Sequence, residues 1–446
     1  MPPFINHEIH IMKHTTTLIT TLAIATTGAL AQDLERTAPK QDHPIFLVGA
    51  TVHTVSGETI ENGVVSFADG IIGIVGKADD IMPRISLGPD TEIIDLSGKH
   101  LYPGLIDSVT VLGLEEVSAV RATLDKNETG DMTPEVRAYV AVNPDSTVIP
   151  TARANGILTF GVFPTGGTIP GRASILNADG WTTEDLALKR DAGLIINWPR
   201  MRYSGDNAKR QRQRRDERIE NLNEVFRNAS AYTEEHTDRD LRLEAIATAL
   251  PGNNQNPVFI NANSYDQIIA AVNWAADLKL DPVIVGGRDA HLCTDLLAST
   301  ETPVIIGGLY NFPKRNDGAY DEPYSLPAKL EAAGVQWSLT MSGRFAHERN
   351  LPEAMGMAVA FGLDHDAALR GITLDAANIL GVGDRLGSIE PGKHATLVVT
   401  DADILDVTSI VEHAWISGSK IDLTNKQTEL RDKYREKYRQ LEIIED

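Results

Sequence analysis

The stretch that decides the fold is Tyr102-Pro103-Gly104-Leu105-Ile106-Asp107-Ser108-Val109-Thr110-Val111. A Pro-Gly pair precedes an apolar run rich in β-branched residues, which is typical of a turn that enters a buried strand. Side chains at positions i and i+2 of a strand point to the same face. Val109 and Val111 are therefore expected to point the same way, into the interior of the fold.

Apolar segments alternate with helix-like segments from this stretch to about residue 380. Strands are expected at residues 157–163, 258–262, 282–287, 303–307 and 335–340, and a helix at residues 266–278. Near-continuous apolar runs of this length suit a parallel sheet that is covered on both faces. The alternation therefore predicts a series of βα units.

Both ends of the chain predict short strands joined by tight turns. Near the N-terminus these are residues 44–52, 63–76 and 92–99, and near the C-terminus residues 385–399 and 411–420. The Asp69-Gly70 pair inside the second segment is a strong hairpin signal. We expect the two sets of strands to pair, so that one small domain is assembled from both ends.

Three segments resemble signatures of the amidohydrolase superfamily, and best its imidazolonepropionase-like branch. Residues 102–111 are similar to the strand-1 signature Pro-Gly-Leu-Ile-Asp-x-His-x-His. Residues 373–381 resemble the helix that follows barrel strand 8, and residues 385–399 resemble the run that returns the chain to a β-sandwich. The three segments occur in the order found in the family.

The resemblance implies an α/β fold, with a (β/α)8 TIM-like barrel beside a small composite β-sandwich. The barrel would cover residues 102–384, and the sandwich residues 44–101 together with 385–422. Residues 1–31 would form an extension and signal peptide, and residues 423–446 a polar C-terminal helix. The activity implied by the family is hydrolysis of non-peptide carbon–nitrogen bonds.

This sequence departs from the family at the positions of the metal ligands. The two strand-1 histidines fall on Val109 and Val111, and the later ligands fall on Asn261, Gly286 and Ser342. Valine and glycine side chains carry no donor atom for Zn²⁺. Without a metal ion, the pKa of water stays near about 15.7, so hydroxide is not available at neutral pH. No cofactor is therefore expected, and Zn or Fe only if the chain is an active hydrolase.

Several residues remain candidates for a site at the barrel mouth. The catalytic candidates are Asp107, Ser342, His347 and Glu348, and the ligand-binding candidates are Arg172, Asn261, Arg288 and Arg344. Loops at the carboxyl ends of barrel strands form the usual active-site face, and His347 and Glu348 follow the last strand. A surface cluster of ion pairs is the alternative for these two residues, and a tight structural loop is the alternative for residues 164–172.

Composition and the N-terminus restrict the partners and the location. The net charge of −21 argues against nucleic acid or an anionic membrane surface as the main partner. Residues 12–31, with a start at Met12 and cleavage after Ala31, read as a signal peptide, which predicts a periplasmic or secreted protein without a membrane span. A single cysteine, Cys293, excludes an internal disulfide.

Three hypotheses for function follow. The first is a non-catalytic or binding subunit that pairs with a metal-bearing amidohydrolase paralogue. The second is an active hydrolase of cyclic amides, amidines or small amides, with a relocated or metal-free site around Arg172, Asp107, His347 and Glu348. The third is a receptor that holds a small molecule in the barrel mouth.

Overall fold

The computed structural model describes residues 37–232, 239–252, 255–315, 318–341 and 345–444. The expected extension and signal peptide, residues 1–31, lies outside the described residues, so export stays a prediction. Ser342 and Arg344 also lie outside them. No helix among the described segments combines the length and the apolar character needed to cross a bilayer.

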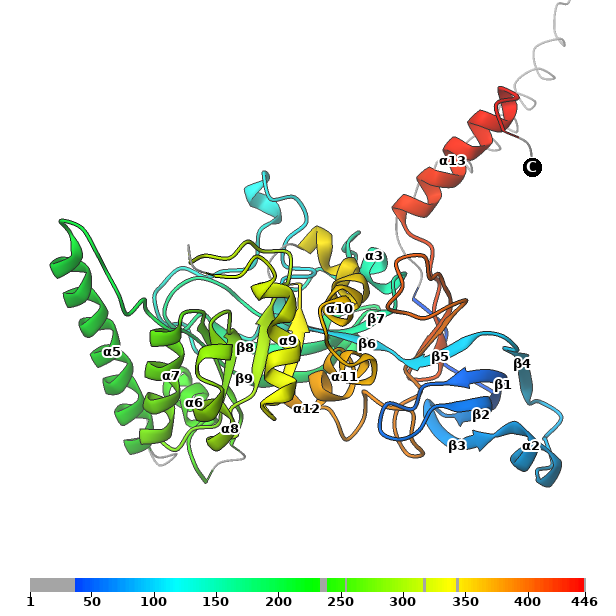
Figure 1. Ribbon diagram of the computed structural model, residues 1–446, viewed down its shortest axis with the longest axis horizontal. Coiled ribbons are helices and arrows are strands. Elements are labelled where there is room, and N and C mark those ends of the chain that lie inside the picture. The colour runs from blue at the N-terminus through cyan, green and yellow to red at the C-terminus, as the bar shows by residue number, and fades with distance from the viewer. Residues whose placement is uncertain (1–36, 233–238, 253–254, 316–317, 342–344, 445–446) are drawn as a thin grey trace, which may run out of the picture. The chain divides into compact units, whose positions relative to one another are not determined.

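Strands from both ends of the chain form one sheet (Figure 1). They are β1 (Ile45–Val52), β2 (Ile60–Ala68), β3 (Ile71–Lys77), β4 (Glu92–Asp95), β5 (His100–Pro103), β14 (Leu397–Thr400), β15 (Val411–Ile416) and β16 (Ser419–Lys420). The order is β16-β15-β14-β5-β1-β2-β3, with β4 also paired to β1. The two ends join where β14 runs antiparallel to β5, with Leu397 opposite Pro103. Phe67, Leu101 and Trp415 lie in a shared core of this sheet, which we call the sheet domain.

A second sheet of eight strands forms the barrel. Its strands are β6 (Leu105–Thr110), β7 (Ile157–Val162), β8 (Gly171–Asn177), β9 (Ala187–Asn197), β10 (Val258–Ala262), β11 (Pro282–Gly286), β12 (Val304–Gly307) and β13 (Trp337–Thr340). They are adjacent in chain order, which confirms the expected strands β7 and β10 to β13. Side chains bring the first and last strands together, since Ser108 Oγ lies 2.9 Å from Ser338 Oγ. The sheet is thus a nearly closed, TIM-like barrel.

One strand breaks the expected (β/α)8 repeat. β8 runs antiparallel to both β7 and β9, so these three strands form a meander inside an otherwise parallel sheet. The loop of residues 163–170 is sufficient to join β7 to β8, because antiparallel neighbours need no helical crossover. The strict repeat implied by the family is therefore wrong for this part of the chain.

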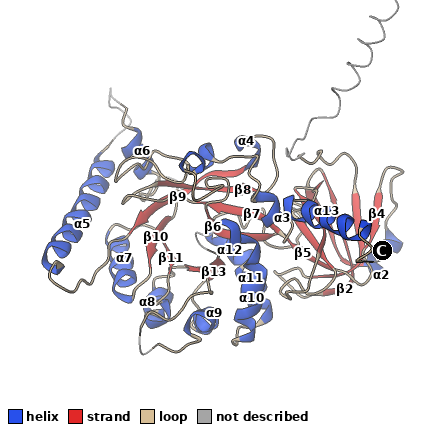
Figure 2. Cartoon of the chain, turned by 90° about the horizontal axis from the view of Figure 1, so that it is seen from above, coloured by secondary structure: helices blue, strands red, loops and turns tan. Residues whose placement is uncertain are grey.

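The other regular elements of the described residues are helices, and most of them lie around the outside of the barrel (Figure 2). The longer ones are α5 (Ala208–Ala231), α6 (Leu241–Ala247), α7 (Tyr265–Asp277), α8 (Thr294–Ser299), α9 (Glu322–Ala332), α10 (Leu351–Ala360), α11 (His365–Gly371), α12 (Leu374–Ile379) and α13 (Lys426–Gln440). The short ones are α2 (Ala78–Ile81), α3 (Ile149–Arg153), α4 (Thr183–Leu186), η1 (Met82–Arg84), η2 (Arg121–Thr123), η3 (Ala138–Ala141), η4 (Ala290–Leu292) and η5 (Phe345–Asn350).

Two apolar clusters separate the inside of the barrel from its outer layer. The inner cluster contains Ile106, Ile195, Phe259 and Ile305 from the strands, together with Ala376, Ala377 and Ile379 from α12. The outer cluster joins the opposite faces of the strands to the surrounding helices, as Leu339 of β13 and Ala271 of α7 illustrate. The barrel is therefore a packed core and not a pore, as is usual for this architecture.

Candidate functional site

The strand-1 stretch does not run as a regular strand. β6 ends at Thr110, and its pairing with β7 shifts between Asp107 and Thr110. Val109 packs against the inner cluster, whereas Val111 lies in the outer cluster. The expectation that both valines point the same way, into the barrel interior, is therefore wrong, because an irregularity in a strand interrupts the alternation of side chains.

Of the remaining positions that the resemblance assigns to metal ligands, Asn261 and Gly286 lie among the described residues, and neither is placed as a metal ligand. Gly286 has a φ of +97°, and a Cβ atom there would lie 2.6 Å from Asn263 Oδ1, so a histidine side chain does not fit without displacing Asn263. Asn261 donates its Nδ2 hydrogen to Asn197 Oδ1 at 2.6 Å. Within the described ranges, no three His, Cys, Asp or Glu side chains are arranged to hold a metal ion. These residues do not fit the nitrogen, sulfur and carboxylate ligands that Zn²⁺ requires.

The structure does bring together two of the predicted catalytic residues. Asp107 lies on β6, and Glu348 lies on η5, which packs against β6. Both side chains are fully buried, and their carboxyl groups are within hydrogen-bonding reach of each other. Apart from that contact, no described donor reaches either Glu348 oxygen or Asp107 Oδ2. By contrast, His347 is exposed beside the pair.

The hydroxyl of Thr340 lies between the carboxyl group of Asp107 and the backbone of β6. Thr340 Oγ1 lies 2.5 Å from Asp107 Oδ1 and 2.6 Å from the backbone oxygen of Val109. A hydroxyl has one hydrogen and cannot donate to both acceptors. The hydrogen bonds to Asp107 and to Val109 therefore compete for the same hydrogen, and Thr340 stabilises an ionised Asp107 only when it donates to that carboxylate.

Burial raises the pKa of both carboxyl groups. Burial raises the pKa of Asp107 to about 6, and hydrogen bonds from Thr340 and the backbone only partly oppose this shift. The pKa of Glu348 is raised well above its ordinary value, first by burial and then by the charge of Asp107. Two neighbouring buried carboxyl groups cannot both ionise without a large cost. The pair therefore carries at least one proton near neutral pH.

Arg172 does not serve as a free clamp for a ligand. Its side chain is buried and forms an ion pair with Asp191 of β9. Its Nε and Nη2 atoms donate to the backbone oxygens of Pro134 and Glu135, each at 3.1 Å. These contacts use the guanidinium group to hold the segment before η3 against β8. The environment of Arg172 thus supports the alternative of a structural loop.

An amide pair that the sequence did not reveal holds the glycine loop at the barrel mouth. Asn197, at the carboxyl end of β9, donates to the backbone oxygens of Gly166 and Gly167 at 3.0 and 2.9 Å. Asn261 of β10 in turn donates to Asn197. The only sequence signal for Asn197 is a polar residue that ends the apolar run of residues 194–196.

Positive charges collect at the same end of the barrel. Arg288 follows β11, is half-buried, and has no ion pair with any described residue; its buried Nε also has no hydrogen-bond partner there. The charge of Arg288, then burial and then the charge of Arg200 lower the pKa of Lys314, and the carboxylate of Asp289 partly opposes this shift, so three cations and one carboxylate lie near one another. A half-buried cation without a counter-ion favours a negatively charged ligand group.

Comparison with known proteins finds sequence relatives described as amidohydrolases and imidazolonepropionases. A model described as "Amidohydrolase family" matches residues 317–428. The amidohydrolase tasK of Hapsidospora irregularis is 23% identical over 392 residues, which cover 78% of this chain but 39% of that protein. The imidazolonepropionase of Mesorhizobium japonicum is 24% identical over 389 residues, which cover 77% of this chain and 87% of that enzyme.

Solved structures agree with the architecture. An amidohydrolase from Thermotoga maritima superimposes with a TM-score of 0.74 and 27% identity, covering 85% of this chain and 99% of that chain. A molinate hydrolase structure has a TM-score of 0.53 and 17% identity, covering 86% of this chain and 95% of that one, and supports only the fold. A barrel with an additional sheet domain is therefore common to these proteins and this chain.

Proposed function

The chain belongs to the amidohydrolase superfamily, with an imidazolonepropionase-like sequence, and on this premise we propose that it binds a small anionic molecule at the barrel mouth without metal-dependent hydrolysis. The observation that carries the proposal is Gly286, where a histidine would be strained at a φ of +97° and would have to displace the side chain of Asn263. Val109 and Val111 support it, since neither offers a ligand and they face different clusters.

The mouth offers recognition groups in place of the metal site. Arg288 presents a cation without a described counter-ion, and Lys314 and Arg200 add positive charge near it. The side-chain oxygen of Asn261 can accept a further hydrogen bond, because its Nδ2 is the atom used by Asn197. A small carboxylate with a neighbouring N–H group matches these features.

We also propose that this binding protein associates with a metal-bearing paralogue, which would supply hydrolysis in the complex. The support is a nearly closed barrel in which the positions that the resemblance assigns to the family's histidines hold Val109, Val111, Asn261 and Gly286. Recovery of this chain alone from an extract of its natural source counts against this part of the proposal.

A binding experiment tests the mouth directly. N-acetylglycine, which carries a carboxylate and a neighbouring N–H group, is expected to raise the melting temperature of the purified protein, because binding to the native state stabilises it. Arg288→Ala is expected to weaken binding about tenfold or more, since it removes a charge-assisted contact. Arg202→Ala, which changes an exposed arginine paired with Asp266, is the matched control. Equal binding by Arg288→Ala, or loss of binding after treatment with a chelator, rejects the proposal.

The buried carboxyl pair supports a second candidate, which is hydrolysis without a metal. An ionised carboxyl could take a proton from the attacking water while the protonated one donates to the leaving nitrogen, so that a C–O bond forms as the C–N bond breaks. A panel of cyclic amides, amidines and small amides tests this idea. If it holds, Glu348→Gln lowers the rate about 100-fold or more, and exposed Glu128→Gln does not. Absence of turnover in the wild type rejects this candidate.

A further inference from the structure

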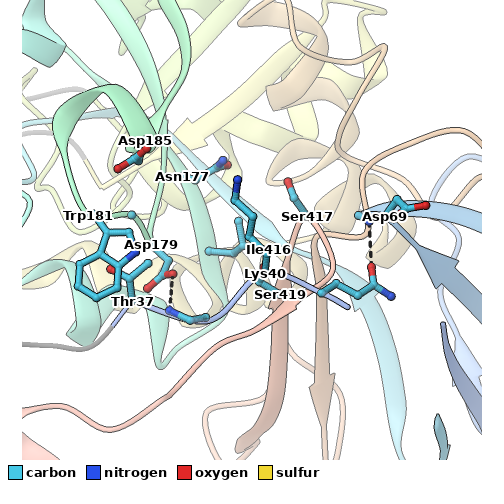
Figure 3. A pocket seen from close by; sticks show the side chains of 14 residues that line it. Thr37, Lys40, Asp69, Asn177, Asp179, Trp181, Asp185, Ile416, Ser417 and Ser419 are labelled. Atoms are coloured by element: carbon cyan, nitrogen blue, oxygen red, sulfur yellow. Dashed lines mark hydrogen bonds between the residues drawn. The ribbon is translucent and has the colours of Figure 1, made fainter. Parts of the chain in front are cut away.

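A pocket lies between the barrel and the sheet domain, and Figure 3 shows its lining side chains. Its volume is about 530 Å³. Asn177, one of its lining residues, pairs with Thr159 near the start of β7 and so marks the amino end of the parallel strands. The other walls come from residues 37–41, from the turn before α4, and from the β2–β3 and β15–β16 turns of the sheet domain. We call this space the amino-end pocket.

The walls of the amino-end pocket are fixed by their own hydrogen bonds. Gln41 donates to the backbone oxygens of His43 and Phe67, at 2.8 and 2.9 Å, and accepts from Gly70 N at 2.8 Å. On the other side, Asp179 forms a buried ion pair with Arg153 at 2.8 Å. Asp179 also accepts a hydrogen bond from the backbone nitrogen at residue 38. The polar groups that build these walls are therefore already used.

Other polar groups in the pocket remain free to meet a ligand. The Oδ1 atom of Asn177 is buried and has no hydrogen-bond partner among the described groups. Lys40 forms no ion pair with a described residue, and Asp185 uses only Oδ2 to cap α4. The indole of Trp181 is 69% exposed. Figure 3 shows these four side chains around the same space.

From this arrangement we propose that the amino-end pocket binds a zwitterion of amino-acid or dipeptide size. Lys40 pairs with the carboxylate of the ligand and Asp185 with its ammonium group. Asn177 Oδ1 accepts an N–H of the ligand, which satisfies a buried acceptor that is costly to leave unpaired. Trp181 provides a flat apolar surface for the ligand side chain. A purely anionic or purely cationic ligand would satisfy only one of the two opposite charges.

The test is a thermal-shift screen of the full chain with the free L-amino acids and with Gly-Gly, each tested separately. At least one of them is expected to raise the melting temperature. Its amide, which lacks the carboxylate, and its N-acetyl derivative, which lacks the ammonium group, are expected to bind at least about tenfold more weakly. If none of the probes stabilises the protein, the proposal is wrong.

Variants test whether the ligand binds in the amino-end pocket and distinguish this site from the barrel mouth. Lys40→Met and Trp181→Ala change exposed side chains, so folding is expected to be preserved, and each is expected to weaken binding about tenfold. Lys77→Met changes an exposed lysine outside the pocket and is the matched control. Arg288→Ala is expected to leave this binding intact. Unchanged binding by the Lys40→Met/Trp181→Ala double variant overturns the proposal, whatever the result at the mouth.

Discussion

Replacing Gly161 with alanine is expected to lower the free energy of unfolding by about 3 kcal/mol or more, which is the upper range for overpacking a core. A Cβ atom at this position would lie 2.1 Å from the backbone oxygen of Ser108. The clash is with backbone, so no side-chain rotation relieves it. It falls where β6 departs from regular pairing with β7, and the same irregularity sends Val111 into the outer cluster. Denaturant unfolding of the two proteins measures the difference.

A glycine in another strand provides the control for this substitution. Gly73 lies in β3, and a Cβ atom there would meet Ser66 Oγ at an ordinary distance of 3.5 Å. Gly73→Ala is therefore expected to change the free energy of unfolding by less than about 1 kcal/mol. Similar stabilities for Gly161→Ala and Gly73→Ala would mean that β6 and β7 are not held this closely in solution.

Much of the fold was predictable from local pattern. The Asp69-Gly70 pair forms the turn between β2 and β3, as predicted. Gly70 adopts a φ of +79°, which suits a tight hairpin turn. The apolar runs at residues 258–262 and 282–287 correspond to β10 and β11, with α7 between them. These features depend on a few neighbouring residues, which is why sequence alone indicates them.

The features of the fold that the sequence did not predict depend on contacts between distant segments of the chain. β8 and β9 went unpredicted although residues 192–196 are buried, since an apolar run does not reveal whether its strand runs parallel or antiparallel. The irregularity in β6 depends on the close approach of Gly161, which lies far along the chain. A strict i, i+2 alternation therefore assigned Val111 to the wrong side.

In the candidate site, too, the sequence indicated individual residues but not the contacts between them. Asp107 and Glu348 were predicted as catalytic candidates for separate reasons, and only the packing of η5 on β6 makes them a pair. Arg172 was predicted from its residue type and its place after a glycine loop, but its actual partners, Pro134, Glu135 and Asp191, could not be read from the sequence. Residue type suggested the chemistry, and tertiary contacts decided which groups were available.

The carboxyl pair predicts an unusual dependence of stability on pH. Both folded-state pKa values are raised, so the native state retains protons that the unfolded chain has already released above about pH 4. Stability contributed by Asp107 is therefore lost as the pH rises from about 4 to its folded pKa of about 6. Glu348 has a pKa well above 4.5 and extends this loss to higher pH. Each proton retained corresponds to a slope of about 1.4 kcal/mol per pH unit.

Glu348→Gln isolates this contribution, because glutamine cannot ionise and can still form a hydrogen bond with Asp107. We expect the stability of the variant to fall less steeply than that of the wild type between pH 4.5 and about 8, so that the two curves diverge in favour of the variant as the pH rises. The comparison has to be made between proteins, since His53, whose pKa burial lowers to about 4, contributes a slope of opposite sign. Glu128→Gln, at an exposed position, should follow the wild type. Parallel curves for Glu348→Gln and the wild type would show that the two carboxyl groups do not share a proton.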